Sequence, residues 1–278
     1  MKRTNSAMRF IRTGAPVLAL AVSAVTSLTA QAQAGRDAQP SEQAVQLQPI
    51  KVEDSGATET ATGPVDGYAA ARSATGTKTD TPIKEIPQSI SVISAGQIRD
   101  QNAQTLQEAL GYSAGVRAAT YGVDNRGDWF TLRGSSESSV LLDGLRLPLS
   151  GWYGSVRNEP FAFERIEVLR GPSSIVAGQN APGGVVNMVS KLPLAEARRL
   201  VSLQLGNFDH KQIALDSTGP FTDGGNLLYR VVALAKDSGT QIDHATDERQ
   251  YISPSLTWLA GDKSILTVYA QYQKDESM

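Results

Sequence analysis

Residues 163–191 read FERIEVLRGPSSIVAGQNAPGGVVNMVSK, and this stretch decides the fold. In its first part, residues 164–170, charged and apolar residues alternate with the two-residue period of a strand that has one face on a core and one in water. The GPSS after this strand ends it and predicts one short helical turn. Gly183 and Gly184 then mark a close backbone approach before a second β-rich run, VVNMV. The stretch predicts strand, short helix, glycine corner and strand, an order that an ordinary α+β crossover shares.

Several motifs carry a resemblance to a known family. The run ERIEVLRGP and the corner PGGxxN resemble the end of the plug domain of TonB-dependent outer-membrane receptors. Three further motifs occur in the order that the family uses: TDTPIKEIPQSISVI at 79–93, TLRG at 131–134 and LDG at 142–144. The resemblance covers residues 76–195, and the residues after 195 are most similar to ferric-siderophore receptors of the hydroxamate (ferrichrome) type. It implies an α+β plug domain followed by the first strands of an antiparallel transmembrane β-barrel.

The composition of the 278-residue chain excludes several classes of protein. A mean hydropathy of −0.23 with 40% hydrophobic residues excludes a helical membrane protein, and a formal net charge of −2 argues against nucleic-acid binding. The chain has no cysteine, so neither a thiolate metal site nor a disulfide framework is possible. His210 and His244 lack the spacing of metal ligands, and no nucleophile, P-loop, dinucleotide or zinc motif occurs. We expect no enzyme activity, no protein-bound metal and no cofactor.

The first 34 residues have the pattern of a signal peptide. Basic residues precede an apolar run at 15–28, which ends in the small-residue sites Ala30-Gln31-Ala32 and Ala32-Gln33-Ala34. A transmembrane anchor is the alternative, but the run is short and rich in Ala, Ser and Thr. Cleavage at either site fits the pattern. Together with the resemblance, the signal predicts export through the periplasm to the outer membrane of a Gram-negative bacterium.

Residues 35–75 are predicted to form a flexible periplasmic tail. Small and polar residues dominate it and leave few large apolar groups to bury. One peptide inside it, Leu47-Gln48-Pro49-Ile50-Lys51-Val52, alternates apolar and polar residues and can add to the open edge of a partner's sheet. By position it resembles the family's TonB box, which implies TonB and its inner-membrane energising complex as partners; an apolar patch in a linker is the alternative. The tail is too short for the signalling domain of some relatives, so we expect a transporter without that function.

Residues 76–195 are predicted to form the plug, a small α+β domain with a mixed sheet. The run 86–93 predicts a strand, and Ser94 with Gln97 has the capping-box pattern of a helix start. Further elements are expected in this order: a helix over 105–110 and β segments at 129–134 and 139–144.

Three aromatic residues of the plug are candidate ligand contacts. Tyr121 lies in a loop, and Trp152 and Tyr153 stand among Gly and Ser residues in an irregular stretch where no helix or strand would bury them. In hydroxamate-type receptors the matching plug loops hold the ferric chelate, so the resemblance implies a siderophore site at these residues. Packing of Trp152 and Tyr153 against the plug is the alternative. The loop at 135–139 is shorter than in ferrichrome receptors, so the identity of the siderophore stays open.

Four charged residues of the first strand need partners if they are buried: Glu164, Arg165, Glu167 and Arg170. In the family these positions face the polar wall of the barrel, so the resemblance implies ion pairs between plug and barrel. For an isolated domain, a strand face in water is the alternative.

In residues 196–278 apolar and polar residues alternate as in β-strands, for example at 201–205, 251–258 and 266–272. The stretch 226–237 does not show which face is apolar, because charged and apolar residues occupy the same alternate positions. We expect apolar side chains to face outer-membrane lipid and polar ones the barrel interior, although a soluble antiparallel sheet has the same alternation. About five strands are too few to enclose a plug, since plugged transporters use about 22. We therefore expect the chain, as part of a receptor or as a truncated product, neither to insert stably nor to transport alone.

These patterns and the resemblance together predict a TonB-dependent receptor that imports a ferric siderophore, with the iron carried as its chelate. Within the family, another large solute such as cobalamin or a saccharide is the alternative. A passive porin or an adhesin would need neither a plug nor a TonB box.

Overall fold

A computed structural model describes residues 59–122, 124–135, 139–147, 156–261 and 264–277. All of them belong to one compact unit, Asp54–Met278. The predicted signal peptide, the predicted TonB box and the pair Trp152 and Tyr153 lie outside the described residues. None of the helices in the described part of the chain is long and apolar enough to cross a bilayer.

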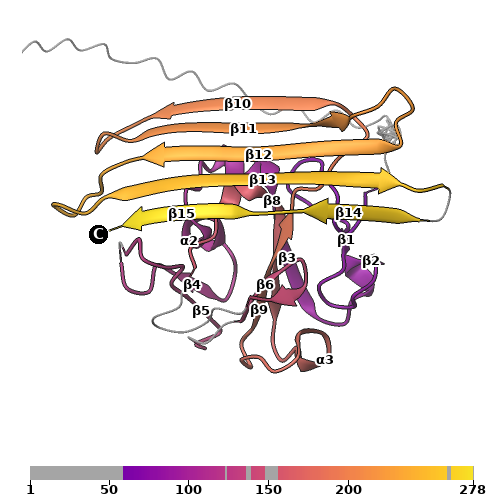
Figure 1. The fold of residues 1–278 in the computed structure, drawn as a ribbon. Helices are drawn as coiled ribbons and strands as arrows, with labels where there is room; N and C mark the ends of the chain where they lie inside the picture. The colour runs from indigo at the N-terminus through magenta and orange to yellow at the C-terminus, as the bar shows by residue number, and fades with distance from the viewer. Residues whose placement is uncertain (1–58, 123, 136–138, 148–155, 262–263, 278) are drawn as a thin grey trace, which may run out of the picture. The chain divides into compact units, whose positions relative to one another are not determined.

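The plug is built on a five-stranded sheet with the strand order β3-β8-β9-β6-β7 (Figure 1). Strands β6 and β9 are parallel and the other neighbours are antiparallel, so the sheet is mixed, as predicted. The five strands are β3 (Ser89–Ser94), β6 (Ser139–Leu142), β7 (Leu145–Arg146), β8 (Phe163–Arg170) and β9 (Gly184–Ser190).

Helix α3 (Ser174–Ala177) connects β8 to β9, which confirms the predicted strand, helix and strand. The glycine corner before β9 is required by backbone contacts. A Cβ atom on Gly183 would lie 2.1 Å from the carbonyl oxygen of Leu132, and one on Gly184 would lie 2.1 Å from that of Leu169. Any side chain at these two positions would push β9 away from its neighbours.

Strand β8 is buried on both faces, so the alternative that its charged face lies in water is wrong. Ile166 and Val168 pack in the main core, which the helices also line. The opposite face is covered by residues 59–82, which we call the lead-in segment. The structure thus differs from the expectation of a flexible tail for residues 59–75, because a buried face of charged side chains binds them.

The short elements of the plug surround this sheet. Helix α1 begins at the predicted cap, where the Ser94 hydroxyl accepts a hydrogen bond from the Gln97 N–H at 3.1 Å. Helix α2 begins in the same way at Thr105, whose hydroxyl accepts from the Glu108 N–H at 3.2 Å. Their bounds and those of the remaining elements are β1 (Arg72–Ser73), β2 (Thr81–Pro82), η1 (Ile83–Glu85), α1 (Ala95–Asp100), α2 (Leu106–Leu110), β4 (Val116–Ala118), β5 (Phe130–Leu132) and η2 (Pro160–Ala162).

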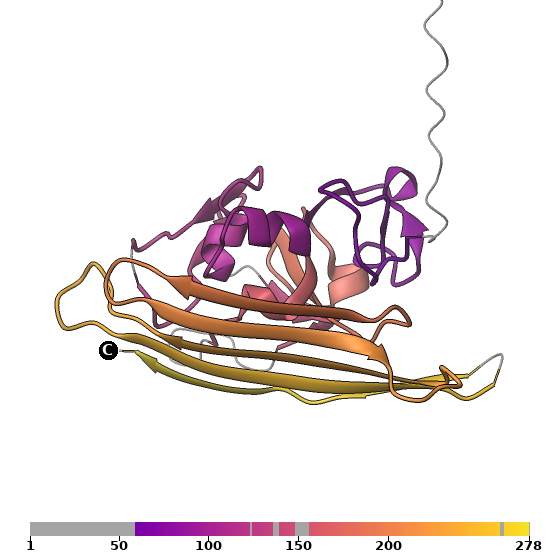
Figure 2. The same cartoon turned by 90° about the horizontal axis from the view of Figure 1, so that it is seen from above.

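A second, larger sheet holds six antiparallel strands in the order β10-β11-β12-β13-β14, with β15 also paired to β13. Figure 2 shows these strands as one curved layer with the plug elements on a single side. The described strands form an open sheet: β10 (Arg198–Leu205), β11 (Lys211–Pro220), β12 (Leu227–Asp237), β13 (Asp247–Leu259), β14 (Ile265–Tyr269) and β15 (Tyr272–Ser277).

The two faces of the large sheet differ in polarity. Side chains turned away from the plug include Ile213, Ile252 and Trp258, which are 51%, 43% and 51% exposed. Side chains turned towards the plug are buried and largely polar, among them Asp216, Arg230, Lys236, Arg249, Ser253, Ser255 and Thr257. This arrangement, with apolar side chains outward and polar side chains inward, is the one predicted for a barrel. It does not suit a soluble sheet, whose exposed face would be polar.

The inward face of strand β12 holds both charged and apolar side chains, which is why its sequence pattern did not show which face is apolar. Arg230 and Lys236 share the buried face with Val232 and Leu234. The two apolar residues join the main core of the plug, whereas the two charged ones pair with carboxylates. The inward face of this strand is mixed because it contacts the plug rather than water.

Candidate functional site

A pair of aromatic rings marks the loop between β4 and β5. Tyr121, which is 55% exposed, meets Trp129 edge to face, with ring centroids 5.6 Å apart and an interplanar angle of 81°. The hairpin brings the two together, since Ala118 pairs with Phe130 and the Thr120 N–H donates to the Trp129 carbonyl at 3.4 Å. The sequence indicated Tyr121 as a ligand contact, whereas it placed Trp129 in a strand. Only the hairpin register brings Trp129 to Tyr121, so no local signal in the sequence indicates this contact.

An ion pair lies in the same loop. Arg126 Nε and Nη2 donate to the two carboxylate oxygens of Asp124 at 2.9 and 2.7 Å, and the Arg126 N–H donates at 3.0 Å. These bonds lower the pKa of Asp124 to about 2. The loop therefore offers aromatic rings beside a guanidinium that Asp124 neutralises, groups that suit a polar ligand. Within the described ranges, no three carboxylate or histidine side chains gather as a metal site requires.

Glu164 is the one of the four predicted interface charges that the structure places against the large sheet. Its Oε2 accepts from Arg230 Nη1 at 2.9 Å, and Arg230 also donates to both carboxylate oxygens of Asp216 at 2.8 Å. Lys191 Nζ lies 2.9 Å from Asp216. Two acids and two bases, all nearly buried, thus join the plug to β11 and β12.

Arg165 faces the lead-in segment instead. Its Nη1 donates to the carbonyl of Arg72 at 2.8 Å, and its Nη2 donates to the carbonyls of Thr60 and Gly63 at 2.9 and 2.6 Å. The guanidinium is completely buried, with the Glu59 carboxylate 3.5 Å away. Most of its partners are therefore backbone carbonyls.

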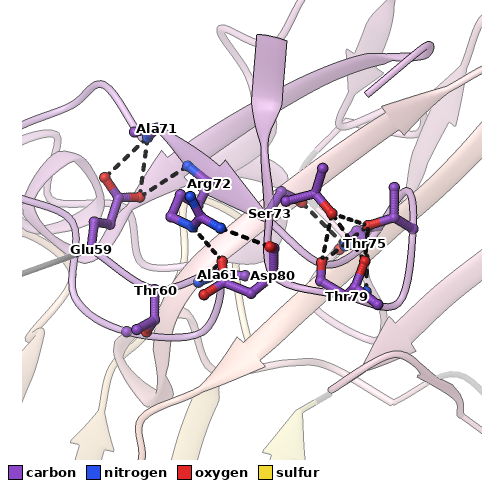
Figure 3. A network of polar contacts seen from close by, with 12 residues as sticks. Glu59, Thr60, Ala61, Ala71, Arg72, Ser73, Thr75, Thr79 and Asp80 are labelled. Atoms are coloured by element: carbon purple, nitrogen blue, oxygen red, sulfur yellow. Dashed lines mark hydrogen bonds and ion pairs between the residues drawn. The ribbon is translucent and has the colours of Figure 1, made fainter. Parts of the chain in front are cut away.

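The lead-in segment is also folded on itself, as Figure 3 shows. The Glu59 carboxylate accepts two hydrogen bonds from the Ala71 N–H, at 3.0 and 3.1 Å. Asp80 Oδ1 accepts from Arg72 Nε at 2.6 Å and from the Ala61 N–H at 3.1 Å. These contacts hold the segment in the form that meets Arg165.

Glu167 binds the same segment through hydroxyl groups. Ser73 Oγ and Thr75 Oγ1 donate to Glu167 Oε2 at 2.6 and 2.5 Å, and Asn187 Nδ2 donates to Thr75 Oγ1 at 2.8 Å. Burial raises the pKa of Glu167, although these bonds and the nearby Arg165 favour its ionised form.

Arg170 lies at the far end of β8, where Nε donates to the Ala114 carbonyl at 2.6 Å and Nη2 donates to Ser91 Oγ at 2.8 Å. Burial lowers the pKa of Arg170, and the neighbouring Arg133 adds to this effect. Arg165, Glu167 and Arg170 thus have their partners within the plug, unlike the prediction that set them against the barrel. The reason is that β8 meets the large sheet only where the strand begins (Figure 1).

A second group of interface charges was not predicted from the sequence. Two plug residues just before η2 pair with the sheet: Arg157 Nη1 lies 2.7 Å from Asp247 Oδ1, and Glu159 Oε2 lies 2.9 Å from Arg249 Nη1. Lys236 and Asp275 complete the group, at 2.8 Å from Asp247 and 2.6 Å from Arg249. Charged residues at inward positions of predicted strands are the signal that could have shown it.

Comparison with known proteins identifies the architecture. Residues 82–185 match the family model described as TonB-dependent Receptor Plug Domain. The chain carries the plug domain of the TonB-dependent receptor family. It is 36% identical over 221 residues to the ferrichrome outer membrane transporter/phage receptor of Escherichia coli. This match covers 78% of this chain and 30% of that protein. It is also 37% identical over 218 residues to the ferrioxamine receptor of Yersinia enterocolitica, a match that covers 77% of this chain and 30% of that protein.

A solved structure agrees with this assignment of the TonB-dependent receptor fold. The ferripyoverdine receptor of the Pseudomonas aeruginosa outer membrane, bound to ferripyoverdine, superposes with a TM-score of 0.72 at 26% identity, over 79% of this chain and 29% of that chain. The predicted family, its outer-membrane location and its plug with barrel strands are confirmed. The chain spans about 30% of the length of the curated relatives it matches.

Proposed function

We propose that this chain supplies the plug and the first barrel strands of an importer for a ferric siderophore, energised through TonB. We call the chain, together with the strands that close its sheet, the complete receptor. The observation that supports this most directly is a plug ion-paired to the polar face of a sheet whose other face is apolar and exposed. Lipid covers such an apolar face in an outer-membrane barrel. A plug inside the barrel must move before a large solute passes, which requires an external source of energy.

The proposed TonB-binding site is the peptide Leu47–Val52, which precedes the lead-in segment in the sequence. Its alternating pattern suits addition to the sheet edge of TonB through main-chain hydrogen bonds. The proposal includes the signal peptide at 1–34, a tail that begins at residue 35, and the inner-membrane complex as the source of energy.

The proposed substrate is a ferric hydroxamate of the ferrichrome or ferrioxamine kind, after the names of the relatives at 36% and 37% identity. Its contacts on the plug would be Tyr121 and Trp129 with Arg126, joined by Trp152 and Tyr153. The relatives' names describe receptors and transporters, which supports a role without catalysis, and the iron would enter as cargo inside its chelate.

Growth of an iron-starved strain without its own receptors tests this function. The complete receptor should restore growth when ferrichrome or ferrioxamine B is the iron source, because the chelate is then imported. Failure with every ferric siderophore, together with saturable binding of cobalamin or a saccharide, would instead assign the receptor to the other solute.

The coupling to TonB has its own test in the substitution Ile50→Pro. Proline removes a backbone donor from the added strand, so uptake should be lost while chelate binding is kept. The control Ile50→Ala keeps the backbone donor and should retain most uptake. Full uptake by the proline variant would place the TonB contact elsewhere.

A further inference from the structure

Asp128 ties the loop that carries Tyr121 and Trp129 to the segment 156–159. Its Oδ2 accepts two hydrogen bonds from Asn158, one from the backbone N–H at 2.7 Å and one from Nδ2 at 2.8 Å. Burial raises the pKa of Asp128 to about 6, and the bonds from Asn158 act against that rise. The carboxylate is thus a two-fold acceptor placed one residue before an aromatic ring of the candidate site.

The other end of this link is fixed to the large sheet. Arg157 Nη1 lies 2.7 Å from Asp247 Oδ1, and the Arg157 carbonyl accepts from Gln273 Nε2 at 2.6 Å. On the other side of Asn158, Glu159 pairs with a guanidinium of β13 at 2.9 Å. The residues that flank Asn158 are therefore docked on β13 and β15.

Two more contacts hold residues 124–129 of the same loop. Asn125 Nδ2 donates to the Thr246 carbonyl, between β12 and β13, at 2.6 Å. Gln107 Nε2, on α2, donates to the Gly127 carbonyl at 3.1 Å. Residues 124–129 are thus held by α2, by the β12–β13 connection and, through Asp128, by the docked segment.

We propose that Asp128 is a positioning residue of the chelate site, which fixes the Tyr121–Trp129 ring pair relative to the barrel strands. This inference rests on the proposed function. A loop that is already held loses less conformational entropy when a ligand binds, so Asp128 raises the affinity without touching the chelate. It acts on binding rather than on the later movement of the plug.

The test compares uptake of iron-labelled ferrichrome and ferrioxamine B by the complete receptor and its variants. Asp128→Ala should raise the half-saturation concentration about tenfold, as expected from the loss of charge-assisted hydrogen bonds, and leave the maximal rate unchanged. Asn158→Ala should have a smaller effect because its backbone N–H still donates. The double variant should match Asp128→Ala, since both changes act on one contact.

Asp100→Ala is the matched control, because this carboxylate at the end of α1 accepts from Tyr68 away from the loop. It should leave the half-saturation concentration unchanged. If Asp128→Ala leaves that concentration unchanged, or lowers only the maximal rate together with receptor abundance, the inference is overturned and the proposed function stands. A wild-type complete receptor that takes up neither probe overturns the proposed substrate class and this inference with it.

Discussion

Two adjacent residues of β8 bind different parts of the molecule by different chemistry. Glu164 meets the large sheet through Arg230, in a buried group where two acids face two bases. Arg165 meets the lead-in segment, mostly through neutral backbone carbonyls. The plug is thus ion-paired to the barrel strands, whereas its own first residues are hydrogen-bonded to it, with the Arg165 guanidinium and the Glu167 carboxylate at the buried centre of that contact.

This difference bears on how force would pass through the receptor. The lead-in segment follows the proposed TonB box in the sequence, so tension at that box reaches the segment before the plug core. Many of its residues are partly exposed, and local opening begins where few apolar contacts are buried. We expect the lead-in segment to separate from β8 while the contact with the sheet persists.

Arg165→Ala should have the largest effect. It leaves the Glu167 carboxylate buried without a cation and removes the donor from three carbonyls, so we expect the lead-in segment to lose about 3–5 kcal/mol of stability. Hydrogen exchange of residues 59–82 in the complete receptor measures the loss. Arg165→Lys keeps the charge without the planar fork and should lose less. Unchanged exchange in the alanine variant would show that Arg165 does not hold the segment.

Glu164→Ala should have a smaller effect than Arg165→Ala, and it should act on the contact between the plug and the large sheet. Arg230 keeps its bonds to Asp216, so we expect a loss of about 1–3 kcal/mol in the attachment of plug to sheet. A double-mutant cycle with Arg230→Ala, followed by urea unfolding of the complete receptor, measures the coupling. Exchange of the lead-in segment should not change. A coupling energy near zero would contradict the interface role of Glu164.

The pH dependence of the lead-in segment should follow Glu167. Because burial raises its pKa, the folded state holds the proton more tightly than the unfolded state. The contribution of this group to stability is therefore full below the ordinary glutamate pKa and is lost as the pH rises through the raised value. Hydrogen exchange of residues 59–82, measured across this range, should show the trend in the wild type and lose it in Glu167→Gln. The same trend in both proteins would assign it to another group.

Asp80→Ala should have the smallest effect. Its ion pair with Arg72 is partly exposed, with 29% of the arginine and 47% of the aspartate side chain accessible, and such pairs contribute less than about 1 kcal/mol. We expect a slight increase in exchange near Ala61 and Arg72. An effect as large as that of Arg165→Ala would mean that the segment is held mainly by its internal contacts.

Local signals in the sequence predicted much of this fold. The cap at Ser94, the short helix after GPSS and the glycine corner depend on residues within a few positions of one another, and all three are present. The alternation along β13 likewise reports which side chains turn outward, because strand geometry alone sets it.

The partners of the buried charges could not be predicted from the sequence. Arg165 and Gly63 are 102 residues apart, and no local pattern records that one covers the other. For the same reason the sequence suggested a water-exposed face for β8 and a flexible tail for residues 59–75. At the candidate site it proposed Tyr121 from its place in a loop, but it did not propose Trp129, which only the hairpin register brings to Tyr121.

The central claim is that the lead-in segment is a less stable unit than the contact between plug and sheet. Hydrogen exchange of the complete receptor in a lipid membrane, followed by mass spectrometry, tests it directly. We predict that amides of residues 59–82 exchange together and well before those of β8 and β9. If β8 and β9 exchange together with residues 59–82, or before them, the claim is contradicted.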